Sequence, residues 1–373
     1  MLKGVDKMAR GTIKHGFLGG NTPQGFYSYY RYILDQQEAV RIISIKGGPG
    51  VGKSTFMRKI GEAMLEKGYG VEYMHCSSDN HSLDGVVIPA IKVALLDGTA
   101  PHVVDPIHPG AVDEILNLGE YWNEEGISRH KQAIIDSSAK VGKLFARAYR
   151  YLAASKEFYD DMYMIYQEAT KEACVNKEAT NIIENELQNM PLSDKVGKVR
   201  KLFVSAITPS GLCNELDSIV KNETVYKISG ESGTGTEKLI KKVREAAIER
   251  GLDVESYYCP MQPEEKLEHI VISKIGLTLT TSNQYHDIQM PHKKSINLMQ
   301  YVDNKKLDAY KDTLYYDKKM FEQLLNKSID TIKKAKEEHD YLETFYIPNM
   351  HFDQIEICLK KTLTRIETYT LEY

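Results

Sequence analysis

Two glycine-rich segments, Gly47–Thr55 (GGPGVGKST) and Gly230–Lys238 (GESGTGTEK), constrain the fold more than any other feature of this chain. The first matches the phosphate-binding pattern G-x-x-x-x-G-K-[ST], follows the apolar run 40–45 and precedes a helical pattern. In that context glycine amides at a helix N-terminus bind phosphate oxygens, a lysine neutralises phosphate charge, and a hydroxyl binds magnesium. The second segment keeps both glycines of the pattern, but Thr236 and Glu237 replace the lysine and the serine.

The surroundings of the two segments also repeat. Gly47 and Gly230 are 183 residues apart, and T-P-x-G turns precede both, at 22–25 and 208–211. Further residues match at nearly the same spacing: Gly68 with Gly251, Cys76 with Cys259, Ile88 with Ile272, His102 with His286 and His108 with His292. The chain is therefore one unit of about half its length, duplicated.

The sequence pattern of each unit predicts a strand, a glycine loop, an amphipathic helix and a second strand, an order typical of a parallel α/β core. Beyond Pro109 the pattern predicts long helices over 111–186 and 295–341, and a last helix after Pro348 to about residue 368. We therefore expect an α/β fold with two tandem P-loop NTPase-type parallel-sheet units, each followed by a long helical segment.

This organisation predicts five segments. They are an active core at 1–110, a helical segment at 111–190, a linker at 191–198, a degenerate core at 199–293 and a second helical segment at 294–373. We expect the two units to pack on each other.

The amino-acid composition limits the classes of partner and the cellular location that we expect. The net charge of −4 gives no electrostatic reason to expect nucleic acid or an anionic membrane as a partner. Five cysteines without a C-x-x-C pair indicate reduced thiols. The first 20 residues lack the apolar run of a signal peptide, and the chain lacks the roughly 20-residue apolar stretch of a membrane helix. We therefore expect a cytoplasmic protein.

The intact loop supplies the first candidate site residues. Lys53 is the expected catalytic cation, Ser54 the magnesium ligand and Thr55 a contact to the α phosphate. The expected nucleotide-binding residues are Gly47, Gly48, Pro49, Gly50, Val51, Gly52, Lys53, Ser54 and Thr55.

Comparison of the two halves adds two carboxylates, because polar residues found in the first half alone are candidates for chemistry. Asp97 ends the apolar run 93–96 and has Thr281 as its counterpart, so we expect it to bind magnesium, directly or through water. Asp79 follows the second strand and has Gln262 as its counterpart, so it could orient the attacking oxygen. The alternatives are a turn or cap role for Asp97 and an Asx turn for Asp79.

Other pairs point to structure or leave the role open. The counterpart of Asp84 is Glu268, which keeps the negative charge, so the comparison does not separate a structural role from a functional one. His102 and His108 recur in the degenerate half, so we expect structural roles for these histidines and for their counterparts. Glu237 would repel a phosphate charge about 4 Å away by roughly 4 kcal/mol at an effective dielectric near 20, which disfavours triphosphate binding at the second segment.

Four segments together resemble a bacterial family of tandem P-loop proteins labelled as ATPases or nucleotide kinases. They are the intact loop, the lead-in at 19–25, the stretch 75–80 (HCSSDN) and the stretch 83–109. The resemblance implies ATP binding and hydrolysis at Lys53 and Ser54. Members of the family tend to keep an intact second loop, from which this sequence departs.

These features favour a magnesium-dependent ATPase that uses ATP and Mg²⁺ at the first loop, with the second unit a non-catalytic pseudo-domain. One alternative is a small-molecule or nucleotide kinase whose helical segment is a lid. Another is an ATP-dependent switch that binds a protein partner without significant turnover. The sequence names neither the phosphoryl acceptor nor the partner.

Overall fold

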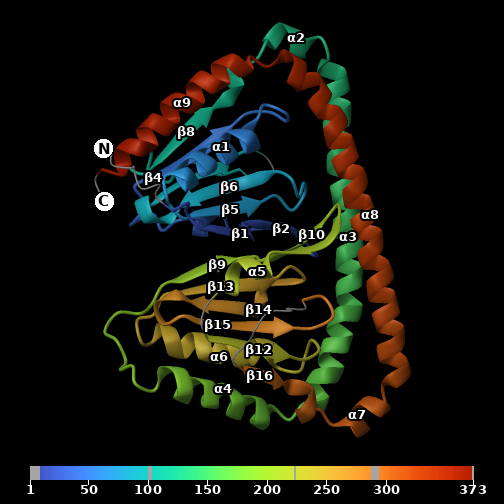
Figure 1. Ribbon diagram of the computed structural model, residues 1–373. Helices are drawn as coiled ribbons and strands as arrows, with labels where there is room; N and C mark the ends of the chain where they lie inside the picture. The colour runs from blue at the N-terminus through green and yellow to red at the C-terminus, as the bar shows by residue number, and fades with distance from the viewer. Residues whose placement is uncertain (1–8, 100–102, 222–223, 287–293, 372–373) are drawn as a thin grey trace, which may run out of the picture. The chain divides into compact units, whose positions relative to one another are not determined.

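The structure, a computed structural model, describes residues 9–99, 103–221, 224–286 and 294–371. These residues form an α/β protein with two six-stranded sheets and two two-stranded sheets (Figure 1). His102 and His292 lie outside the described residues.

The strands of the first large sheet are, in spatial order, β1 (Ile13–Phe17), β5 (Val71–His75), β6 (Leu83–Ile88), β7 (Val93–Asp97), β4 (Arg41–Lys46) and β8 (Asp113–Asn117). Those of the second are β9 (Val199–Leu202), β13 (Val254–Cys259), β14 (Gln262–Ile272), β15 (Leu277–Ser282), β12 (Thr224–Ser229) and β16 (Lys294–Asn297). The two-stranded sheets are β2 (Gly19–Thr22) with β3 (Gly25–Ser28) and β10 (Ser205–Thr208) with β11 (Gly211–Asn214).

The two large sheets share one topology. In each, the third strand in the spatial order is antiparallel to both of its neighbours, while the other neighbouring pairs are parallel. A duplicated sequence predicts this shared topology, but the expectation of parallel sheets holds only in part, because one strand of each sheet is antiparallel to its neighbours. The antiparallel strand follows its predecessor directly in the chain, through residues 76–82 in the first sheet and 260–261 in the second.

The helices are α1 (Lys53–Glu66), α2 (Glu124–Ser128), α3 (Lys131–Ala169), α4 (Glu172–Leu187), α5 (Leu216–Ile219), α6 (Thr236–Ile248), α7 (Asn304–Asp308), α8 (Lys311–Tyr346) and α9 (Phe352–Tyr369). The prediction of helix over 111–186 was wrong at its start, because Asp113–Asn117 pairs with β4 as strand β8. The prediction over 295–341 failed in the same way at β16. Each strand completes the edge of a sheet, and this pairing outweighs the local helical pattern.

The chain divides into two compact units that do not follow the order of the sequence. Unit 1 comprises 1–19, 28–145 and 332–373, and unit 2 comprises 20–27 and 146–331. Both boundaries in the helical part fall inside a helix, α3 in one case and α8 in the other. Each unit therefore contains one six-stranded sheet and a part of each long helix.

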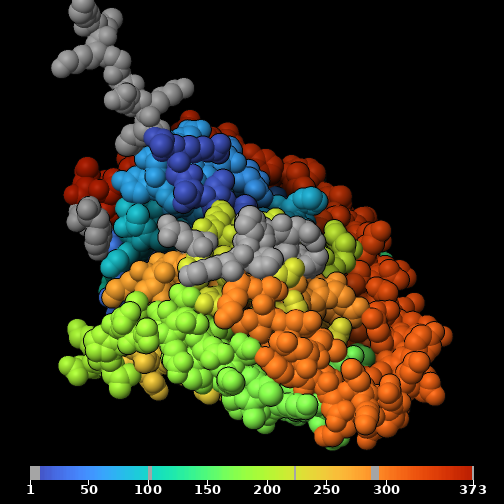
Figure 2. All heavy atoms as spheres, turned by 60° about the horizontal axis from the view of Figure 1, so that its bottom comes forward, coloured from blue at the N-terminus to red at the C-terminus, as the bar shows by residue number. Residues whose placement is uncertain are grey.

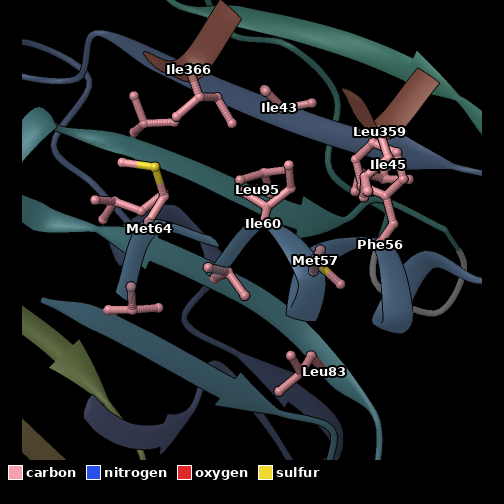
Figure 3. Close-up of a cluster of buried hydrophobic side chains, with 14 of the residues drawn as sticks. Ile43, Ile45, Phe56, Met57, Ile60, Met64, Leu83, Leu95, Leu359 and Ile366 are labelled. Atoms are coloured by element: carbon pink, nitrogen blue, oxygen red, sulfur yellow. The ribbon is translucent and has the colours of Figure 1, made fainter. Parts of the chain in front are cut away.

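Unit 1 buries its helix α1 between the sheet and α9. Phe56, Ile60 and Met64 lie on one face of α1 at helical spacing and are at most 2% exposed. Leu359 and Ile366 of α9 point toward this cluster, as Figure 3 shows. The C-terminal helix therefore completes the core of the sheet formed by the first third of the chain.

Unit 2 has an equivalent cover, which α4 supplies. This helix packs on α6, and its Val175, Ala179 and Ile182 are almost fully buried. Its outer residues remain at the surface in Figure 2, in light green beside the orange residues that follow β16. There the Tyr301 hydroxyl donates to Glu178 Oε1 at 2.6 Å.

None of the helices in the described residues combines the length and the apolar character that crossing a membrane requires.

Candidate functional site

The first glycine loop (Gly47–Gly52, hereafter glycine loop 1) connects the end of β4 to the start of α1. Gly50 and Gly52 have φ values of 67° and 89°, a region that favours glycine. Gly52 is the N-cap residue of α1, so the loop ends at the positive end of the helix dipole. This backbone has the features of an anion site: a glycine-rich turn followed by a helix N-terminus.

Lys53 and Asp97 come together at this loop. The Lys53 ammonium donates to the carbonyl oxygens of Gly47 at 3.1 Å and Gly48 at 2.9 Å, and it lies 3.6 Å from Asp97 Oδ2. The pairing follows from the sheet, because β4 and β7 are parallel neighbours and Ile45 is in register with Asp97. Both side chains are largely buried, at 12% and 16% exposed, so their attraction is less screened than that of a surface pair.

Asp97 also has the turn role that the sequence left open. Its Oδ1 accepts from the Thr99 amide at 2.8 Å, and the Thr99 hydroxyl in turn donates to the Gly47 carbonyl at 3.0 Å. The turn and a metal-binding role are compatible, because Oδ2 is left facing Lys53.

Ser54 lies at the first turn of α1 and contacts the neighbouring strand. Its hydroxyl oxygen accepts from the Leu83 amide at 3.0 Å, at the start of β6. The hydroxyl retains its proton and a second lone pair for other partners.

Asp79 is held by its own turn and by α8. Its carboxylate accepts from the His81 amide at 3.2 Å and from the Ser82 hydroxyl at 2.9 Å, which is the turn that the alternative reading predicted. The Lys336 ammonium lies 3.4 Å from Oδ2. The structure thus brings Lys53 and Asp97 into contact, whereas the contacts of Asp79 given above join it to its own turn and to α8.

The end of α8 packs directly against glycine loop 1. A Cβ atom on Gly48 would lie 2.9 Å from the ring of Tyr346, and one on Gly50 would lie 2.8 Å from Ile347. His339 belongs to the same region, because Lys53 is among the charges that act on it. Burial lowers the pKa of His339, the Glu343 carboxylate opposes this shift, and Lys53 adds to it.

Sequence reasoning missed the contribution of α8 altogether. Lys336 and Tyr346 are almost 300 residues from glycine loop 1 in the chain, and no local pattern marks them as its neighbours. One weak signal is Gly48. The phosphate-binding pattern does not require glycine at this position, so a glycine there is consistent with a neighbour that leaves no room for a side chain.

The second glycine loop (Gly230–Gly235, hereafter glycine loop 2) has a similar backbone and different chemistry. It connects β12 to α6, and Gly235 has a φ of 88°, nearly that of Gly52. Glu237 is buried, at 8% exposed, and its Oε1 accepts from the Tyr163 hydroxyl at 2.8 Å. A Cβ on Gly233 would lie 2.1 Å from the Tyr163 carbonyl oxygen, so the backbone of α3 closes against this loop.

Comparisons with protein-family models, curated proteins and solved structures found nothing that matches this chain.

Proposed function

We propose that the protein binds ATP with magnesium at glycine loop 1 and hydrolyses it there. The observation that carries this proposal is the meeting of Lys53 Nζ and Asp97 Oδ2, 3.6 Å apart, at the ends of adjacent parallel strands and at the N-terminus of α1. A cation for phosphate and a carboxylate for a metal ion are the two charges that phosphoryl transfer needs side by side.

Each of these residues has its own role in the proposed binding and hydrolysis of ATP. Lys53 leaves the carbonyl oxygens of Gly47 and Gly48 and binds the β and γ phosphates, together with the loop amides. Ser54 and Asp97 would hold magnesium, which would neutralise charge on the transferring phosphoryl group. Asp79 would orient the attacking water after releasing Lys336.

Unit 2 does not bind ATP in this proposal. Glu237 places a buried negative charge where the intact loop has a serine, and α3 packs against Gly233. A bound triphosphate would have to displace α3 and face this carboxylate, and both requirements oppose binding.

Two measurements test the proposal. Calorimetry with a non-hydrolysable ATP analogue and Mg²⁺ should give one site per chain, and released phosphate should report turnover. Lys53→Ala should abolish measurable binding, whereas Asp97→Asn should leave binding of the analogue detectable and lower turnover by about 10²-fold or more. Lys238→Ala is the matched control, because Lys238 is the exposed lysine of the second segment and should have no effect.

The outcome also separates the alternatives. Tight binding without phosphate release would favour the switch, and release that depends on an added metabolite would favour a kinase. Two sites per chain, or unchanged binding in Lys53→Ala, would overturn the proposal.

A further inference from the structure

A β-bulge in unit 2 places two neighbouring polar residues of β14 together. In the pairing of β13 with β14, Tyr257 is opposite His269 and Tyr258 is opposite Leu267, so Glu268 is an extra residue. Successive side chains of a strand normally point to opposite faces, and a bulge changes this direction. As a result, ligand atoms of Glu268, His269 and His286 all lie within 4.8 Å of one another.

These three residues are buried and leave strong acceptor atoms unused. Glu268 is 1%, His269 0% and His286 7% exposed. Within the described residues, Glu268 Oε2 and His269 Nε2 have no hydrogen-bond partner. Buried polar atoms are almost always satisfied, so two such atoms facing one cluster call for an additional partner.

A hydrogen bond at Nδ1 of His269 orients the ring so that Nε2 can bind a cation. Its Nδ1 lies 2.7 Å from the Thr280 hydroxyl oxygen, and that hydroxyl is directed at the Thr281 carbonyl oxygen at 3.4 Å. The hydroxyl oxygen therefore accepts a hydrogen bond from Nδ1–H, which leaves the lone pair on Nε2.

Glu268 and His286 are already spaced as ligands of one ion. Glu268 Oε2 lies 3.6 Å from His286 Nε2, which also lies 3.2 Å from the Ser205 hydroxyl oxygen, a contact that metal binding would replace. The edge of a tetrahedral site with bonds of about 2.1 Å is roughly 3.4 Å.

Lys266 contacts Glu268 Oε1 and leaves Oε2 available to a metal ion. Its ammonium lies 3.2 Å from Glu268 Oε1 and donates to the Tyr159 hydroxyl at 2.8 Å. A pocket that opens to solvent is lined by Lys266, Glu268 and His286 among others. It provides an entry path and room for water or a small anion as a further ligand.

Unit 1 has the same bulge without the same residues. Met74 pairs with Gly85 and His75 with Leu83, so Asp84 takes the position of Glu268 and Gly85 that of His269. The histidine is thus a feature of unit 2, in which Thr236 stands where glycine loop 1 is followed by Lys53.

We propose that Glu268, His269 and His286 bind one divalent transition-metal ion, with zinc as the best match to a two-histidine, one-carboxylate set and with a further position open to the pocket. Unit 2 then has a site of its own, and the structural role expected for His286 is replaced by a ligand role. This inference does not depend on ATP hydrolysis in unit 1.

The test uses the full chain, stripped with a chelator and titrated with Zn²⁺ in competition with a zinc indicator. Wild type should bind one equivalent at this site. His269→Ala and Glu268→Gln should each weaken that binding by 100-fold or more, and Thr280→Val by 10- to 100-fold. His130→Ala, at an exposed histidine, is the control and should change nothing.

A second cluster of possible ligands, His339, Asp340 and Glu343 on α8, must be separated from the first. Zinc that is retained in His269→Ala and lost in His339→Ala would overturn the proposal, as would no binding by wild type. X-ray absorption of zinc-loaded wild type should show two imidazoles at about 2.0–2.1 Å. This measurement decides the case even if a buried variant fails to fold, because a spectrum without two imidazoles also overturns the proposal.

Discussion

At the scale of single residues, the contact between Lys53 and Asp97 links the sequence motif to the tertiary structure. The motif specifies Lys53 by its distance from the glycines, but it says nothing of Asp97. Asp97 was predicted from its absence in the second half, and the sheet explains why it reaches the lysine: parallel neighbouring strands end at the same edge. The comparison of the two halves thus identified a residue that contacts Lys53 although it lies 44 residues further along the chain (97 − 53).

His75 should make the stability of unit 1 depend on pH. Burial lowers its pKa from 6.5 to about 4, with a further contribution from His15. The unfolded chain then binds the proton more tightly, so stability is complete above pH 6.5 and falls as pH decreases toward 4. Urea unfolding should show a loss of no more than about 2 kcal/mol between pH 7 and pH 5 from this residue.

The variant His75→Gln isolates this contribution. Trp122, the sole tryptophan of the chain, packs against the core of unit 1 and provides the fluorescence signal. The variant should flatten the pH dependence, and His130→Gln should keep it. An unchanged slope in His75→Gln would show that other groups cause the effect.

At the scale of elements, the sequence predicted the strand, glycine loop and helix of both halves because their apolar periodicity and glycines are local signals. It did not predict β8 or β16, whose short sequences become strands only beside β4 and β12. It also did not predict the bulge that joins Glu268 to His269, because a bulge is a property of the pairing and not of one strand.

Helix α9 should contribute to the stability of unit 1 through one buried face. Ile366 is fully buried against the core, whereas Ile357 on the same helix is 46% exposed. Ile366→Ala should destabilise unit 1 by about 2–5 kcal/mol through lost burial and the cavity left behind. Ile357→Ala should cost less than about 1 kcal/mol.

Urea unfolding followed by Trp122 fluorescence measures both variants. Equal effects of the two substitutions would mean that α9 does not pack on α1 in solution as it does here.

At the scale of the whole molecule, each compact unit is built from both halves of the sequence. The repeat in the sequence indicates two similar cores. The apolar face of an amphipathic helix, however, does not indicate which of the two cores it packs on. Here α9, from the end of the second half, packs on the core of unit 1, and α4, from the first half, packs on α6 in unit 2. The fold of either unit therefore depends on the complete chain.

This interleaving predicts how the protein responds to being divided at 194/195, within the expected linker. Fragment 1–194 contains Trp122 and α1 but lacks α9, so the face of α1 formed by Phe56, Ile60 and Met64 loses part of its cover. Alone, it should unfold at a much lower urea concentration than the full chain, or without a cooperative transition. Addition of fragment 195–373 should restore the transition in a 1:1 complex, and Ile366→Ala in that fragment should weaken the restoration. A fragment 1–194 that unfolds like the intact protein would show that its core is complete without α9.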